Sequence, residues 1–101
     1  MTDPDWRMRA LRERIDALDE QIVALLNERA MCALQIGEIK RETGMPIYQP
    51  GRERDVLDHV RGVNAGPLDG DAVKRLFERI IDEARRLERE VQKAHEQRAD
   101  E

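Results

Sequence analysis

Apolar residues in the first part of the chain recur in steps of three and four, and this spacing constrains the fold more than any other feature. The residues in the series are Met8, Leu11, Ile15, Leu18, Ile22, Leu25, Cys32 and Ile36. Such steps place side chains on one stripe of a helix, the stripe that packs against a partner. Two positions of the same stripe carry Arg29 and Lys40 instead. Because a buried cation is costly to desolvate, each needs an anionic partner, either an internal carboxylate or a ligand.

Breaks in the periodicity divide the chain into three helices. The first is predicted at about residues 4–42, with a capping aspartate and a proline at its start and Thr43-Gly44 at its end. A loop containing Pro46 and Pro50 leads to a short helix at about 52–63, and a third helix follows at about 70–94. We expect the polar tail, residues 95–101, to fray. The predicted fold class is all-α, long–short–long, in a single domain of residues 1–101.

The composition limits both the core and the partners. Charged residues make up 40% of the chain and aromatic residues 3%, so we expect packing between chains in place of a thick core within one chain. Cys32, on the stripe, is expected to be a small buried residue. The net charge of −4 disfavours nucleic-acid binding, and His59 and His95 fit no metal-ligand spacing. No segment approaches the ~20 apolar residues of a membrane span, so a cytoplasmic protein without membrane contact is expected.

Charged residues also occur on or beside the apolar faces elsewhere in the chain, at Arg12, Arg52, Glu53 and Glu88. One interpretation is a structural ion-pair network, in which Arg29 pairs with Glu53 or Glu88 and sets the helix register. The other is a ligand site. Such positions occur on all three predicted helices, and cations dominate them in an acidic chain, which favours the ligand site. Arg29 and Lys40 lie about 16 Å apart along one helix axis, a separation that suits a small dianion.

At these positions the chain resembles the all-helical class of chorismate mutase. The matching segments are residues 10–19, 25–29, 36–40, 52–54 and 75–81, within a resemblance that covers about residues 7–92. It implies an intertwined homodimer of three-helix chains with two active sites, each taking one arginine from the partner chain. It also implies an isomerase of the shikimate pathway, which rearranges chorismate to prephenate for phenylalanine and tyrosine biosynthesis and uses no cofactor or metal.

The resemblance assigns the cations of the first helix to the substrate. Arg29, together with Arg12 from the other chain, matches the pair that binds the two carboxylates of chorismate. Lys40 matches the lysine that contacts the ether oxygen and a carboxylate. These three residues, with Glu88, are therefore the expected catalytic and substrate-binding groups.

The remaining site positions come from the loop and the other two helices. Glu53 matches the glutamate that accepts a hydrogen bond from the ring hydroxyl, with Arg52 beside it and Gln49 at the loop position near that hydroxyl. Ala84 replaces a serine that helps to hold a carboxylate in some relatives, so one hydrogen bond is expected to be missing. Glu88 occupies a position where well-known bacterial members have glutamine. It can donate to the ether oxygen only when protonated, and the sum of burial and nearby cations decides its pKa.

Two alternatives to the mutase remain open. Isochorismate pyruvate lyase uses the same scaffold and a similar cationic pocket, although the arginine–lysine–glutamate set and the Ile-Tyr-Gln-Pro loop look more like those of mutases. The chain could instead be a non-catalytic helical dimerisation or regulatory module, but such a module need not keep Arg12, Arg29, Lys40 and Glu53. Dependence on a partner enzyme of the shikimate pathway also stays open, because some short mutases are weak until such an enzyme binds.

Overall fold

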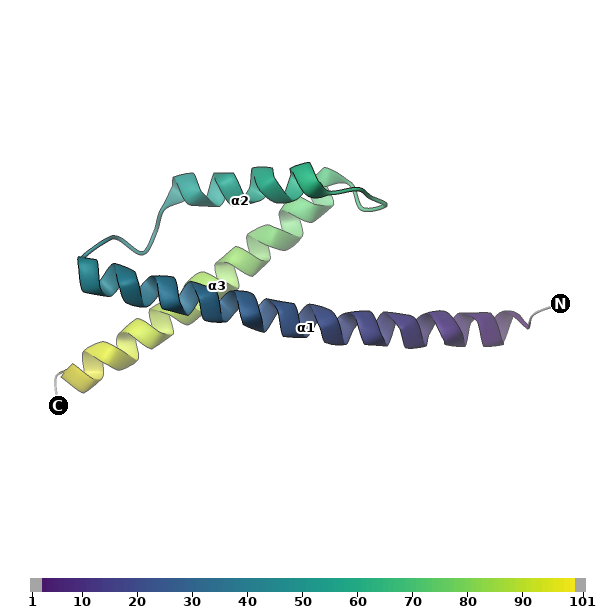
Figure 1. Ribbon diagram of the computed structural model, residues 1–101, viewed down its shortest axis with the longest axis horizontal. Coiled ribbons are helices and arrows are strands. Elements are labelled where there is room, and N and C mark those ends of the chain that lie inside the picture. The colour runs from purple at the N-terminus through teal and green to yellow at the C-terminus, as the bar shows by residue number, and fades with distance from the viewer. Residues whose placement is uncertain (1–2, 100–101) are drawn as a thin grey trace. The chain divides into compact units, whose positions relative to one another are not determined.

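The chain folds into three helices that follow one another in the order long, short, long. The computed structural model describes residues 3–99, and within this range it contains α1 (Pro4–Thr43), α2 (Pro50–Val63) and α3 (Gly70–Ala99) (Figure 1). No strand occurs among these residues. The predicted all-α fold class is therefore confirmed.

Local side-chain chemistry explains where the helices begin and end. Asp3 Oδ1 accepts a hydrogen bond from the Asp5 amide at 3.1 Å, and Asp69 Oδ1 accepts one from the Ala72 amide at 2.7 Å. Both aspartates thereby satisfy amides that the first turn of a helix leaves free. Gly44, with φ 71°, terminates α1.

The end of α3 differs from the prediction. The helix continues to Ala99, so residues 95–99 are helical and do not form the expected frayed tail, while residues 100 and 101 lie outside the described range. No glycine or proline interrupts this stretch, and Gln92 donates a hydrogen bond to Glu96 at 3.2 Å across one turn. Charge alone is therefore a poor indicator of fraying when the residues are good helix formers.

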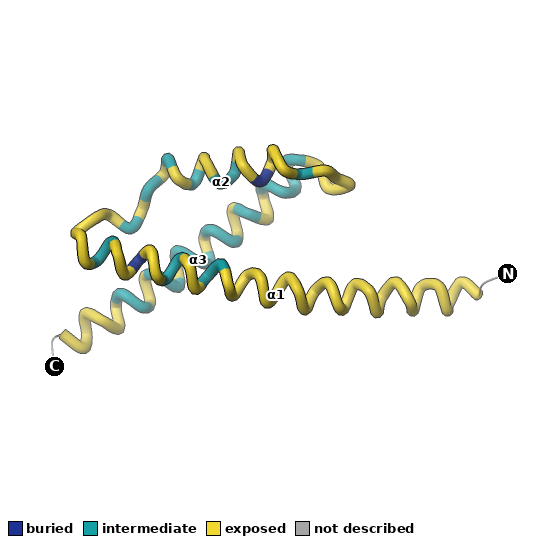
Figure 2. The backbone as a smooth tube through the Cα atoms, viewed as in Figure 1, coloured by how far each residue is buried: buried dark blue, intermediate teal, exposed yellow. Residues whose placement is uncertain are grey.

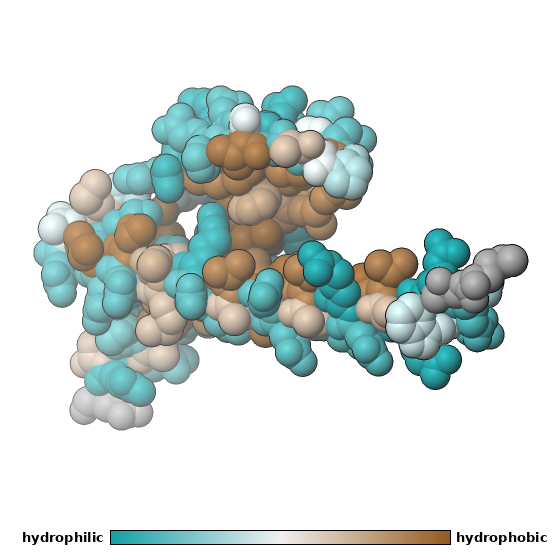
Figure 3. All heavy atoms as spheres, turned by 45° about the vertical axis from the view of Figure 1, so that its right-hand side comes forward, coloured by the Kyte–Doolittle hydropathy of each residue, from teal (hydrophilic) through white to brown (hydrophobic). Residues whose placement is uncertain are grey.

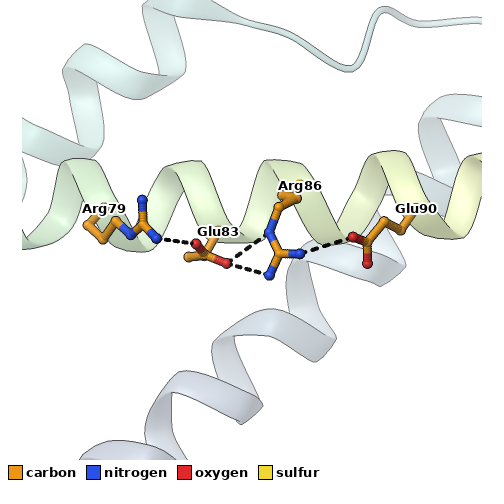
Figure 4. Close-up of polar contacts among 4 residues, drawn as sticks. All are labelled: Arg79, Glu83, Arg86 and Glu90. Atoms are coloured by element: carbon orange, nitrogen blue, oxygen red, sulfur yellow. Dashed lines mark hydrogen bonds and ion pairs between the residues drawn. The ribbon is translucent and has the colours of Figure 1, made fainter.

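An ion-pair ladder runs along the exposed face of α3. Arg79 contacts Glu83 at 2.8 Å, and Arg86 contacts Glu83 at 2.8 Å and Glu90 at 3.0 Å (Figure 4). These pairs are three or four residues apart, the spacing at which side chains of opposite charge stabilise a helix. The ladder therefore adds a small stabilisation to α3 that depends on residues of this helix alone.

The structure divides into two units, the first ending at Met31 and the second beginning at Cys32. In the first unit the described residues form the N-terminal part of α1, and its side chains are exposed up to residue 28 (Figure 2). The apolar stripe is exposed too, and hydrophobic side chains appear on the surface of α1 in Figure 3. Leu25, for example, has 62% of its surface accessible to solvent. A helix that exposes an apolar stripe has a face suited to packing against a partner.

The second unit contains the end of α1 together with α2 and α3, and α2 packs against α3. Val60 of α2 is the buried hydrophobic residue of the described chain, with 9% of its surface exposed. Cys32 is exposed, which corrects its predicted burial. Like the stripe to which it belongs, Cys32 lacks a covering surface in the single chain. None of the described helices combines the length and apolar character needed to cross a membrane.

We predict that Val60→Ala lowers the free energy of unfolding by about 1.5 kcal/mol, because the substitution removes the equivalent of two buried methylene groups. Chemical denaturation followed by circular dichroism measures this change. Val63→Ala is the matched control on the same helix, because 67% of Val63 is exposed. Its effect should stay within about 0.5 kcal/mol. Equal losses for the two variants would show that Val60 does not anchor α2.

Candidate active site

Polar residues from the end of α1, the following loop, α2 and α3 come together in the second unit. Lys40 of α1 is half-buried, and its Nζ donates a hydrogen bond to the backbone carbonyl of Ile47 at 3.0 Å. The Met45 amide donates to the carbonyl of Lys40 at 2.9 Å, with Gly44 in the left-handed conformation between them. This is the Schellman arrangement that ends a helix, and it turns the chain so that the loop returns to the lysine.

Glu53 pairs with an arginine that the sequence analysis did not single out. Arg85 Nη2 lies 2.6 Å from Glu53 Oε1, and about a quarter of each side chain is exposed, 26% and 25%. Arg85 also covers the ring of Tyr48, with its Cζ 4.6 Å from the ring centroid. The sequence did contain a signal, because Arg85 lies four residues after Ile81 and three before Glu88, on the side of α3 that carries its apolar stripe.

Glu88 lies against the end of α1. Its Oε2 is 3.7 Å from the position that a Cβ would take at Gly37, and Gly37 is buried. Burial raises the pKa of the Glu88 carboxyl above its ordinary value, although the positive charges of Lys40 and Arg85 lower it. Desolvation therefore outweighs the two cations, so this carboxyl keeps its proton to a higher pH than an ordinary glutamate. This balance is the one that the sequence left open.

The other predicted site residues occupy different surroundings. Gln49 is half-buried at the start of α2, where its carbonyl accepts bonds from the amides of Arg52 and Glu53 at 3.1 and 3.3 Å. The Arg52 side chain is exposed, and Ala84 is half-buried on α3. The structure thus uses the main chain of Gln49 to begin α2, and its side chain makes no capping bond.

Arg12 and Arg29 belong to the first unit, where Arg12 is exposed and Arg29 is half-buried. Their expected contribution to the same site stays a prediction. The structural alternative, in which Arg29 pairs with Glu53 or Glu88, stays a prediction as well, and within the second unit Glu53 pairs with Arg85. Within residues 3–99, no group of three histidine, cysteine or acidic residues is arranged to hold a metal ion.

Four ionisable side chains of the second unit follow one another as neighbours, in the order Lys40, Glu88, Arg85 and Glu53. When all four are ionised, their charges alternate in sign. Three of the four are predicted site residues, and they come from three different helices. A half-buried ammonium offers a hydrogen-bond donor to an oxygen atom, and a neighbouring carboxyl of raised pKa offers a second one when it is protonated. Such an arrangement is suited to stabilising negative charge that develops on a bound molecule.

Comparison with known proteins identifies relatives along most of this chain. The family model described as chorismate mutase type II matches residues 11–89. A bifunctional chorismate mutase/prephenate dehydratase of Pseudomonas aeruginosa is 41% identical over 100 residues, which cover 94% of this chain and 27% of the relative. The chain spans about a quarter of the length of this relative and of two other curated bifunctional chorismate mutase/prephenate dehydratases that it matches.

Solved structures give the same result. A chorismate mutase from Thermus thermophilus superimposes with a TM-score of 0.80 at 34% identity, over 82% of this chain and 94% of that one. A chorismate mutase from Helicobacter pylori in complex with prephenate gives a TM-score of 0.78 at 31% identity, over 85% and 93%. Because the family match spans most of the sequence and the related structures share the fold, the chain belongs to the chorismate mutase type II family.

Proposed function

We propose that this chain rearranges chorismate to prephenate in phenylalanine and tyrosine biosynthesis, and that it does so in the cytoplasm without a cofactor. The observation that carries the proposal is the half-buried Lys40 beside Glu88, a carboxyl whose pKa is raised. Family membership and the related Helicobacter pylori enzyme, described with prephenate bound, support the choice of substrate.

The proposed reaction is an intramolecular pericyclic shift, so it requires no nucleophile. The protein contributes by holding a flexible dianion in its reactive conformation and by stabilising the charge that gathers on the ether oxygen as the C–O bond breaks. Lys40 is proposed to supply positive charge at that oxygen. An ammonium group has three donors, and the bond to the Ile47 carbonyl uses one of them. The other two suffice for the ether oxygen and a carboxylate of the substrate.

Glu88 is the second proposed donor to the ether oxygen. Its raised pKa favours the protonated form, which donates, over the ionised form, which would repel a dianion. Glu53 is proposed to accept a hydrogen bond from the ring hydroxyl, with Arg52 and the Gln49 main chain nearby. Ala84 has no hydroxyl that could donate a hydrogen bond to the substrate. The carboxylates of the substrate are therefore proposed to be held by the cationic side chains of the site.

We further propose that the active assembly is a homodimer in which Arg12 enters the partner's site and joins Arg29 there. The exposed apolar stripe of α1 supports this, because a second copy of the same helix would cover it. Dependence on a further enzyme of the pathway remains an open part of the proposal.

The first test is the conversion of chorismate by the purified chain, followed by its absorbance and by identification of the product. We expect prephenate from the unsubstituted protein, and a loss of about 10²–10³ in rate for Lys40→Met, because a donor to the developing charge is removed. Lys93→Met, which alters an exposed lysine of α3, is the control and should retain full activity. Release of pyruvate from isochorismate, with chorismate untouched, would instead identify the lyase.

The pH dependence tests the role of Glu88. The protonated carboxyl is the proposed donor, so activity should be full below its raised pKa and should fall as the pH increases through that value. Glu88→Gln cannot ionise and should remove this fall. The rate is measured from pH 5 to about 8.5 for both proteins, with the exposed Glu90→Gln as the control. An identical falling limb in Glu88→Gln would refute the role of this carboxyl.

Complementation between variants tests the shared site. Arg12→Ala and Lys40→Met should each be nearly inactive alone, yet refolding them together should restore about a quarter of the wild-type activity. Half of the randomly formed dimers would be mixed, and each mixed dimer would have one intact site. Activity that stays at the level of the separate variants, in a mixture shown by sedimentation to be dimeric, would mean that Arg12 acts within its own chain.

A further inference from the structure

Arg85 connects three segments of the second unit. From α3 it contacts Glu53 in the first turn of α2 at 2.6 Å, and it covers Tyr48 in the loop before α2 at 4.6 Å. Lys40 holds the neighbouring residue of that loop through the Ile47 carbonyl. The loop is therefore attached at two successive residues, once by the end of α1 and once by α3.

The next residue, Arg86, shows what an ordinary arginine of α3 does. Arg86 bonds to Glu83 and Glu90 of its own helix, and 60% of its side chain is exposed (Figure 4). Arg85 has 26% exposed, and its partners come from other segments. Exposed ion pairs within one helix contribute little, whereas a partly buried pair between segments fixes the relative orientation of its two side chains.

The geometry leaves Glu53 able to act while it is held. Arg85 approaches Oε1, and a carboxylate has a second oxygen and further lone pairs that can accept a hydrogen bond. A planar guanidinium directs its donors in fixed directions and can stack on an aromatic ring at the same time. Arg85 can therefore set the rotamer of Glu53 and the position of the loop together, and lysine could reproduce the charge but not this combination.

We propose that Arg85 is a positioning residue of the active site, which orients Glu53 toward the ring hydroxyl of the substrate and fixes the Tyr48 loop beside it. This role rests on the proposed mutase function and extends it to a residue that acts through Glu53. It differs from a simple attachment of α2 to α3, because it requires the effect of Arg85 on catalysis to pass through Glu53.

The test compares Arg85→Met and Arg85→Lys with Arg86→Met as the matched control, all in the full chain. We expect Arg85→Met to reduce kcat/KM by about 10- to 100-fold, because small displacements of positioning groups are costly in rate. Arg85→Lys should recover part of the loss, and Arg86→Met should keep wild-type values. Circular dichroism establishes that each variant is folded, and if Arg85→Met is not, the comparison rests on Arg85→Lys.

A double-mutant cycle with Glu53→Gln separates positioning from attachment. The rates are compared at low pH, where Glu88 is protonated with or without the Arg85 charge that lowers its pKa. If Arg85 acts through Glu53, replacing it in the Glu53→Gln protein should then change kcat/KM by less than about twofold, because coupled residues are not additive. Equal fold-losses in both backgrounds, or a lowered unfolding midpoint with wild-type kcat and KM, would overturn the proposal. Absence of chorismate conversion by the unsubstituted chain would instead refute the proposed function, which the wild-type assay detects before any variant is compared.

Discussion

Desolvation of the Glu88 carboxyl against the end of α1 is the interaction on which the proposed chemistry depends. The carboxyl lies over the buried Gly37, with two cations close enough to lower its pKa, and burial still raises it. Without that burial, Lys40 and Arg85 would lower the pKa of the carboxyl and favour its negatively charged form. The contact of Glu88 with the end of α1 therefore widens the pH range in which the proposed site has a second donor beside its lysine.

The helices could be predicted from the sequence because their signals are local. Steps of three and four residues and Gly44 as a stop are readable without knowing the fold, and the structure has the helices and the end of α1 where these signals put them. The predicted end of α3, at about residue 94, was wrong because the polarity of residues 95–99 was interpreted as a sign of fraying. Helix propensity and i,i+4 contacts such as Gln92 with Glu96 decide this instead.

The site was only partly predictable, for a different reason. Lys40, Glu53 and Glu88 could be marked because charge on an apolar face is visible in one helix at a time. Arg85 was not predicted as a site residue, because its contacts are with Glu53 and Tyr48, which belong to other segments of the chain. The direction of the Glu88 pKa was likewise hidden, since it is the difference between two opposing effects that both depend on packing. Periodicity finds the candidates, and only the tertiary structure gives their pairing.

The exposed apolar stripe of α1 and the proposed chemistry both require a second copy of the chain. With Val60 as the buried hydrophobic residue of the described range, the single chain has little core of its own, and its longest helix leaves its apolar residues in solvent. A second copy that covers this stripe would supply the missing burial, and in the proposed dimer it would also supply Arg12. Folding, association and catalysis would then be linked by mass action, so that dilution lowers stability and activity together. In the proposed dimer, two copies would together supply both the burial and the cations that the described residues of one copy do not bring together alone.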